Sequence, residues 1–126
     1  MGCGCGKMGE LLSAQGFTEV EAADANSNYI RHCIVKGWYK KTYELYLGLP
    51  RTDSFNNPTI PEDLRGRFDC VVGCGVFYEG HIPAEGFVDA YDMLKTGGYF
   101  VTSLRKEQYW VKGDHFGYKD TLDRLV

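Results

Sequence analysis

The chain has 126 residues, the length of about one ordinary domain, so an assembly of several domains is excluded. Hydrophobic residues make up 44% and charged residues 25%, which is the balance of a globular rather than a disordered protein. The net charge of −3 offers no basic excess to neutralise phosphates, so nucleic acid is not an expected partner.

The first half of the chain alternates between helix and strand patterns. In chain order the predicted elements are a helix over Lys7–Gln15 ended by Gly16, a strand over Glu19–Ala23 followed by Asp24, a helix capped by Asn26 or Ser27 that runs to Lys36 before Gly37, and a strand over Tyr43–Leu47. In the second helix, Ile30, Ile34 and Cys33 are expected to face the core.

The second half continues the alternation. Its predicted elements are a polar loop over Pro50–Gly66, a buried strand over Phe68–Gly73, a helix that starts at Pro83 and contains Phe87, Val88, Tyr91 and Leu94, a strand over Tyr99–Leu104, and a helix near Lys119. The doublet Gly97-Gly98 is expected to end the third helix. Alternating strands and helices predict a single α/β domain over residues 1–126, with a parallel sheet and flanking helices.

Cysteine and hydropathy patterns predict the compartment. The five cysteines are odd in number, and their spacing matches neither a disulfide framework nor a zinc site. We therefore expect reduced thiols, no bound metal and an intracellular, cytoplasmic protein. The longest apolar run, Cys70–Tyr78, is far shorter than the roughly 20 residues of a membrane span, so no membrane partner is expected.

Glycine is the unusual component, with 16 residues in clusters. The segment Gly2-Cys3-Gly4-Cys5-Gly6 precedes a helix, and Asp24 follows at the end of the next strand. In nucleotide-binding α/β folds such glycines let the backbone approach the ligand, and the carboxylate accepts the ribose hydroxyls. Read from Gly4 to Gly9, the same segment also has the GxGxxG spacing of dinucleotide-binding proteins. A glycine-rich turn beside a surface aspartate is the alternative that involves no ligand.

Four segments together resemble the class I S-adenosylmethionine-dependent methyltransferases. Gly2-Cys3-Gly4-Cys5-Gly6 resembles their glycine motif, and Asp24 resembles their ribose-binding acid. Phe68-Asp69-Cys70-Val71-Val72 is similar to their fourth strand, and Leu94-Lys95-Thr96-Gly97-Gly98-Tyr99 to the turn before their fifth. Within this superfamily, Gly75–Pro83 is similar to a segment of the methyltransferase-like proteins of the Williams–Beuren region.

The resemblance implies a Rossmann-like fold, S-adenosylmethionine as cofactor and methyl transfer to an unidentified acceptor. It implies that Gly2, Cys3, Gly4 and Gly6 border the cofactor, that Asp24 holds its ribose and that Ala25 packs on its adenine. It also implies that Leu49 touches the adenine edge, and that Cys74 and Gly75 lie towards the methyl group. Compared with the superfamily, the chain lacks the segments for the first strand and the last two strands. A domain that is partial at both ends is therefore expected, and the oligomeric state stays open.

Several residues have two interpretations. No catalytic residue is predicted with any pattern behind it, and the sole candidate, His81, follows the fourth predicted strand; ordering of its own loop is the alternative. The late aromatic residues Tyr109, Trp110, Phe116 and Tyr118 are candidates for core packing or for a lid over a substrate. For the whole chain, the alternatives to a methyltransferase are a non-catalytic binding or scaffold protein of the same fold, and a dinucleotide-dependent oxidoreductase.

Overall fold

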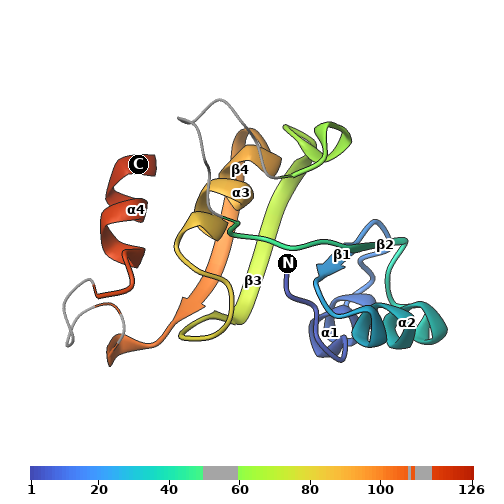
Figure 1. Cartoon of the computed structure of the whole chain (residues 1–126). Helices are drawn as coiled ribbons and strands as arrows, with labels where there is room; N and C mark the ends of the chain where they lie inside the picture. The colour runs from blue at the N-terminus through green and yellow to red at the C-terminus, as the bar shows by residue number, and fades with distance from the viewer. Residues whose placement is uncertain (50–59, 108, 110–114) are drawn as a thin grey trace. The chain divides into compact units, whose positions relative to one another are not determined.

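A computed structural model describes residues 1–49, 60–107, 109 and 115–126. The chain divides into two compact units, Met1–Tyr46 and Leu47–Val126. Both units mix helices with a small parallel sheet, as Figure 1 shows, so the predicted α/β class is confirmed at this level. The predicted loop residues 50–59 and Trp110 lie outside the described residues.

The first unit is a pair of parallel strands joined by a helix. Its elements are α1 (Lys7–Ala14), β1 (Glu21–Asp24), α2 (Ser27–Lys36) and β2 (Lys41–Glu44). The strands pair from Glu21 with Lys41 to Asp24 with Glu44, and α2 packs on both. As predicted, Asn26 caps α2, because its side chain accepts a hydrogen bond from the Asn28 N–H at 2.9 Å.

The core of this unit is narrow. Ala22, Ala23, Ile30 and Cys33 are buried, but Ile34 is 60% exposed, so its predicted inward orientation is wrong. Each strand of this sheet has only four residues, and two such strands cover only a thin stripe of α2. Ile34 lies beside that stripe rather than on it.

The second unit is built around a longer pair of parallel strands. Its elements are the 3₁₀ helix η1 (Glu62–Leu64), β3 (Phe68–Phe77), α3 (Glu85–Met93), β4 (Leu94–Leu104) and α4 (Tyr118–Leu125). The strands are in regular register from Cys70 with Tyr99 to Gly73 with Thr102. The register shifts on either side of this stretch, and the second shift falls between Gly73 and Phe77.

An aromatic cluster fills the core of the second unit. Phe77 and Phe87 lie with ring centroids 4.4 Å apart, and Phe87 lies 5.6 Å from Tyr118 and 5.7 Å from Phe100. These rings come from β3, α3, β4 and α4, so the cluster ties the four elements together. Tyr118 is only 2% exposed, which assigns this late aromatic residue to the core rather than to a lid.

Several predicted boundaries are wrong, among them the end of β3, which is Phe77 and not Gly73. The strand expected at Tyr43–Leu47 is Lys41–Glu44, because it pairs with β1, which ends at Asp24. The third helix ends at Met93, and Leu94 begins β4 instead of completing the helix. The Gly97-Gly98 doublet lies inside β4, where Gly97 has a φ of +79° and takes up the register shift between Leu94 and Tyr99.

A buried carboxylate in α3 fixes the start of the second unit. Asp89 is fully buried, and its Oδ2 accepts a hydrogen bond from the Gly48 N–H at 2.6 Å. Gly48 has a φ of +73°, and a Cβ there would lie 2.6 Å from the Pro83 ring. Only glycine meets both conditions at this position.

We expect Asp89→Ala to lower the free energy of unfolding by about 1.5–3 kcal/mol, because the buried Gly48 N–H would lose its charged acceptor. Urea denaturation followed by circular dichroism measures this change. Asp123→Ala, which removes the exposed partner of Lys119, is the control and is expected to cost less than about 1 kcal/mol. Equal losses in the two variants would contradict the role given to Asp89.

Candidate functional site

The glycine-rich segment forms a tight loop at the C-terminal end of β1. Gly2, Gly4 and Gly6 have φ values of +63°, +51° and +85°, a region that other residues rarely adopt. The Cys3 N–H donates to the Ala23 carbonyl at 3.1 Å and so joins the loop to the strand. The alternation of glycines in the sequence therefore corresponds to an alternation of left-handed turns that leads into α1.

Asp24 connects the loop to the turn that follows β1. Its Oδ2 accepts a hydrogen bond from the Gly4 N–H at 2.8 Å, and its Oδ1 accepts one from the Asn26 N–H at 2.9 Å. Two carboxylate oxygens offer about four acceptor sites, so both retain capacity for a further donor. Ala25 lies between Asp24 and Asn26 and is partly exposed. The structure thus brings together the glycine loop, Asp24 and Ala25, while their role in binding a cofactor stays a prediction.

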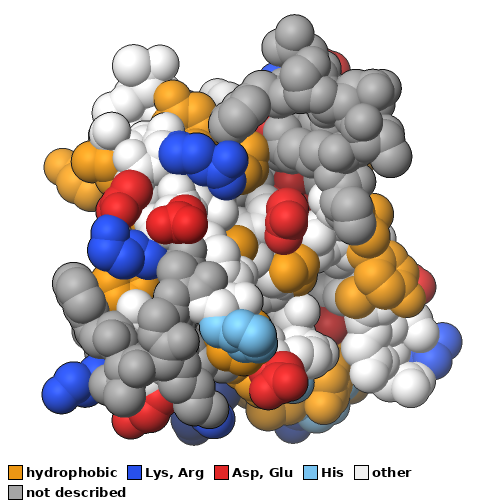
Figure 2. Space-filling view, turned by 60° about the vertical axis from the view of Figure 1, so that its left-hand side comes forward, with side chains coloured by type: hydrophobic (Ala, Val, Ile, Leu, Met, Phe, Trp, Pro, Cys, Tyr) orange, Lys and Arg blue, Asp and Glu red, His pale blue; other side chains and the backbone are white. Residues whose placement is uncertain are grey.

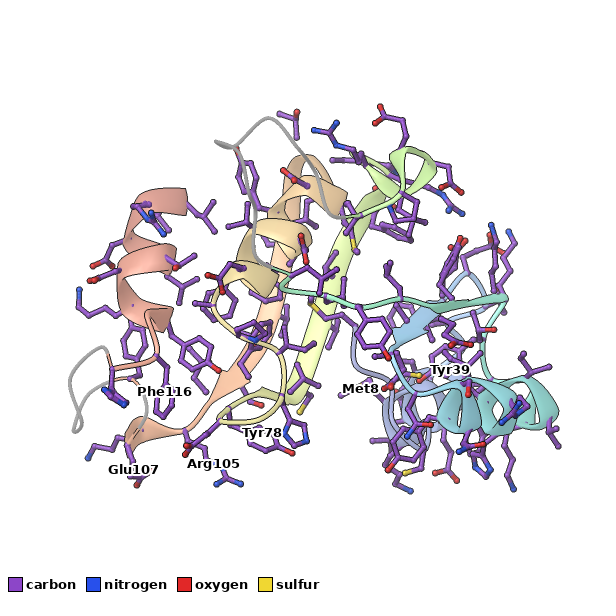
Figure 3. All side chains as sticks on the ribbon, in the orientation of Figure 1. Met8, Tyr39, Tyr78, Arg105, Glu107 and Phe116 are labelled. Atoms are coloured by element: carbon purple, nitrogen blue, oxygen red, sulfur yellow. The ribbon has the colours of Figure 1, made fainter. Side chains whose placement is uncertain are left out.

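Gly6 and Gly9 also have a packing role. A Cβ on Gly6 would lie 2.9 Å from the Trp38 ring, and a Cβ on Gly9 would overlap the Tyr39 ring. The Tyr39 hydroxyl accepts a hydrogen bond from the Gly9 N–H at 2.9 Å, and Tyr39 and Met8 are labelled in Figure 3. Tyr39 supports the loop through α1. No sequence pattern indicated this contact, because Gly9 and Tyr39 are distant along the chain.

The thiols beside the loop are protonated. Cys3 Sγ lies 3.8 Å from Cys33 Sγ, and Cys33 Sγ lies 3.5 Å from the Gly4 carbonyl. Burial, together with the neighbouring Cys33 and Asp24, raises the pKa of Cys3 to about 12. Burial also raises the pKa of Cys33. Both side chains therefore fill space under the loop at neutral pH and do not serve as thiolate nucleophiles.

Leu49, in the second unit, projects from the fixed segment that contains Gly48. Its side chain is 46% exposed and therefore accessible to a ligand. The hydrogen bond from Gly48 to Asp89 holds the residue before it, so the backbone of Leu49 is anchored although its side chain is not. The resemblance implied Leu49, and no feature of the sequence indicated Asp89.

Cys74 and Gly75 lie in the irregular part of β3. Gly75 has a φ of +66°, and its N–H donates to the Ser103 hydroxyl at 2.8 Å. Ser103 thus replaces a carbonyl acceptor of the regular ladder where the register shifts. Both Cys74 and Gly75 are exposed, and Ser103 also lies 3.7 Å from Cys74 Sγ. Bulges of this kind often redirect side chains at the end of a strand.

His81 closes a turn directly after β3. Its N–H donates to the Tyr78 carbonyl at 3.0 Å, and its imidazole Nε2 is hydrogen-bonded to the Tyr78 hydroxyl. One turn therefore orders both Tyr78 and His81. A role of His81 in ordering its loop is observed, while a catalytic role stays a prediction.

Charged side chains of both signs are interspersed on the face shown in Figure 2. The described residues contain no group of three or more His, Cys, Asp or Glu side chains that could hold a metal ion. Within the same part of the chain, every helix is too short or too polar to cross a membrane. Compared with models of known protein families and with curated protein sequences, the chain matches none.

We expect alkylation to separate the cysteines by environment. With a pKa of about 12, roughly one Cys3 side chain in ten thousand is a thiolate at pH 8, so iodoacetamide should leave Cys3 unmodified in the folded protein. The exposed Cys5, Cys70 and Cys74 should be modified first. Peptide mass spectrometry measures the extents, and Cys3 modification should rise as the pH approaches 12. Modification of Cys3 as fast as that of Cys5 would contradict the protonated, packed thiol.

Proposed function

We propose that this protein binds S-adenosylmethionine and transfers its methyl group to an acceptor. The observation that carries the proposal is the contact between the Gly4 N–H and the Asp24 carboxylate. It joins a glycine loop to an acid at the C-terminal end of the neighbouring strand, which is the arrangement that nucleotide-binding α/β folds use for a ribose and its attached group. A Rossmann-like methyltransferase fold is part of the same proposal, supported by two parallel strand pairs with helical crossovers.

The residues of the first unit fit such a ligand. A Cβ on Gly4 would meet nothing within 4 Å, so the backbone there is open to close approach. Asp24 keeps acceptor capacity for ribose hydroxyls after its two backbone contacts. Gly2, Cys3 and Gly6 would border the ligand with Gly4, and Ala25 would pack against the adenine. Roles for Leu49, Cys74 and Gly75 stay predictions from the resemblance.

The bound cofactor would supply an activated methyl group on a sulfonium. The protein then needs to hold the acceptor in line with that group and to exclude water, and it does not need a strong acid or base. The protonated state of Cys3 agrees with this mechanism, because methyl transfer from the sulfonium requires no nucleophile in the glycine loop.

One observation favours a dinucleotide as the second candidate ligand. Gly9 allows close packing of α1 against Tyr39, and close helix packing is the task of the third glycine in the GxGxxG motif. NAD is therefore the comparison ligand in any binding experiment.

We expect Gly4→Ala to weaken binding of S-adenosylhomocysteine by at least about tenfold, because the added methyl group would occupy the space through which the backbone meets the ligand. Isothermal titration calorimetry measures the affinity. Gly16→Ala is the matched control, since Gly16 has a φ of +87° and equally open surroundings but lies at the end of α1. Both variants should lose about 1–2 kcal/mol of stability through backbone strain, and only Gly4→Ala should lose affinity.

Other outcomes would redirect the proposal. Binding of NAD without binding of S-adenosylhomocysteine would favour the oxidoreductase. A cooperatively folded protein that binds neither ligand would favour the non-catalytic scaffold.

A further inference from the structure

Two parallel strands of the second unit end beside each other in a group of three side chains. Tyr78 directly follows β3, Arg105 directly follows β4, and His81 lies in the turn after Tyr78. Figure 3 shows Tyr78 and Arg105 at this carboxyl edge of the sheet. Ligands of open α/β sheets bind outside the carboxyl ends of the strands, so this edge is where a ligand of the second unit is expected.

The turn of residues 78–81 places the imidazole on the phenol ring. Gly80, in its third position, has a φ of +79°, as a type II turn requires. The rings of Tyr78 and His81 then stack with centroids 3.7 Å apart at an angle of 30°. The Tyr78 hydroxyl is hydrogen-bonded to Nε2, and in the tautomer in which Nε2 is the acceptor the imidazole proton is on Nδ1.

Arg105 rests on the same tyrosine. Its Cζ lies over the Tyr78 ring, 5.1 Å from the ring centroid, which is within the range of a cation–π interaction. Among the described residues, Arg105 forms neither an ion pair nor a side-chain hydrogen bond. The ion pairs between described residues of this unit use other cations, as Lys95 does with Asp69 at 2.7 Å.

The acidic residues nearby leave the guanidinium available. Glu107 lies two residues further along and is exposed, and it forms no ion pair with Arg105 in the described structure. Glu79 lies within the turn itself and has interactions of its own. Unpaired donors on Arg105, which lies on the Tyr78 ring as His81 does, suit a ligand that brings its own negative charge.

We propose that Arg105 and His81, held by Tyr78, bind an oxyanion group of a ligand, a carboxylate or a phosphate. The planar guanidinium can donate to two oxygens of such a group side by side, and the imidazole adds a third donor in the tautomer with its proton on Nδ1. Only the identification of this ligand as the methyl acceptor rests on the proposed function. In that case the acceptor is an anionic molecule, bound through its charge at the ends of β3 and β4.

The test is a titration of the ¹⁵N-labelled protein with sodium phosphate and, separately, with sodium acetate, at ionic strength held constant with sodium chloride. We expect saturable shifts of the Arg105 Nε–Hε and His81 ring signals, with a dissociation constant on the order of millimolar. Saturation by acetate identifies a carboxylate site, and saturation by phosphate identifies a phosphate site. Saturation by neither probe overturns the proposal.

Two neighbouring cations supply the matched variants. Arg105→Gln and Lys106→Gln each remove one positive charge from an exposed position. Arg105→Gln should weaken binding of the probe by about tenfold or more, and Lys106→Gln by less than about twofold. Arg105→Lys, which keeps the charge and loses the planar fork, should also weaken it several-fold. Equal effects of Arg105→Gln and Lys106→Gln would show general charge attraction and overturn the site.

The two proposals fail separately. The oxyanion titration needs no cofactor, and binding of S-adenosylhomocysteine is followed through the amide signals of Gly4 and Gly6. Oxyanion binding without S-adenosylhomocysteine binding would support the site and remove its designation as an acceptor site. S-adenosylhomocysteine binding without oxyanion binding would leave the methyltransferase proposal standing and overturn the anionic acceptor.

Discussion

The arrangement of the first unit depends on a carboxylate that accepts a hydrogen bond from a left-handed glycine. A backbone in that conformation turns its N–H away from the neighbouring strand, and a partly buried N–H needs another acceptor. Asp24 provides it for Gly4 and, with its second oxygen, fixes the turn that begins α2. One side chain thereby holds the loop, the strand end and the next helix in a single geometry.

The second unit solves the same problem with the same chemistry. Asp89 accepts the N–H of Gly48, which is also left-handed, and does so from the middle of a helix rather than from the end of a strand. Asp89 is fully buried whereas Asp24 is only partly buried. This difference separates their roles: the buried carboxylate is shielded from solvent, and the accessible one has acceptor capacity left for a ligand.

Features that depend on neighbouring residues were predicted better than features that depend on distant segments. The cap at Asn26, the stop at Gly37 and the left-handed glycine loop depend on neighbouring residues, and all are found where the sequence indicates. The errors at Leu94, Ile34 and the β2 boundary arise from pairing with distant segments, which decides where a strand begins and which helix face is covered. Helical spacing alone carries no information on either.

The oxyanion site shows why part of the chemistry escapes sequence reasoning. Nothing in the spacing of His81 and Arg105 along the chain signals that both lie against Tyr78. The two residues come together through the parallel sheet. It brings the ends of β3 and β4 to one edge, where the guanidinium of Arg105 lies over the Tyr78 ring. A cation that is already positioned by an aromatic ring loses little conformational freedom when an anion arrives, which is the physical reason to expect specificity at this edge.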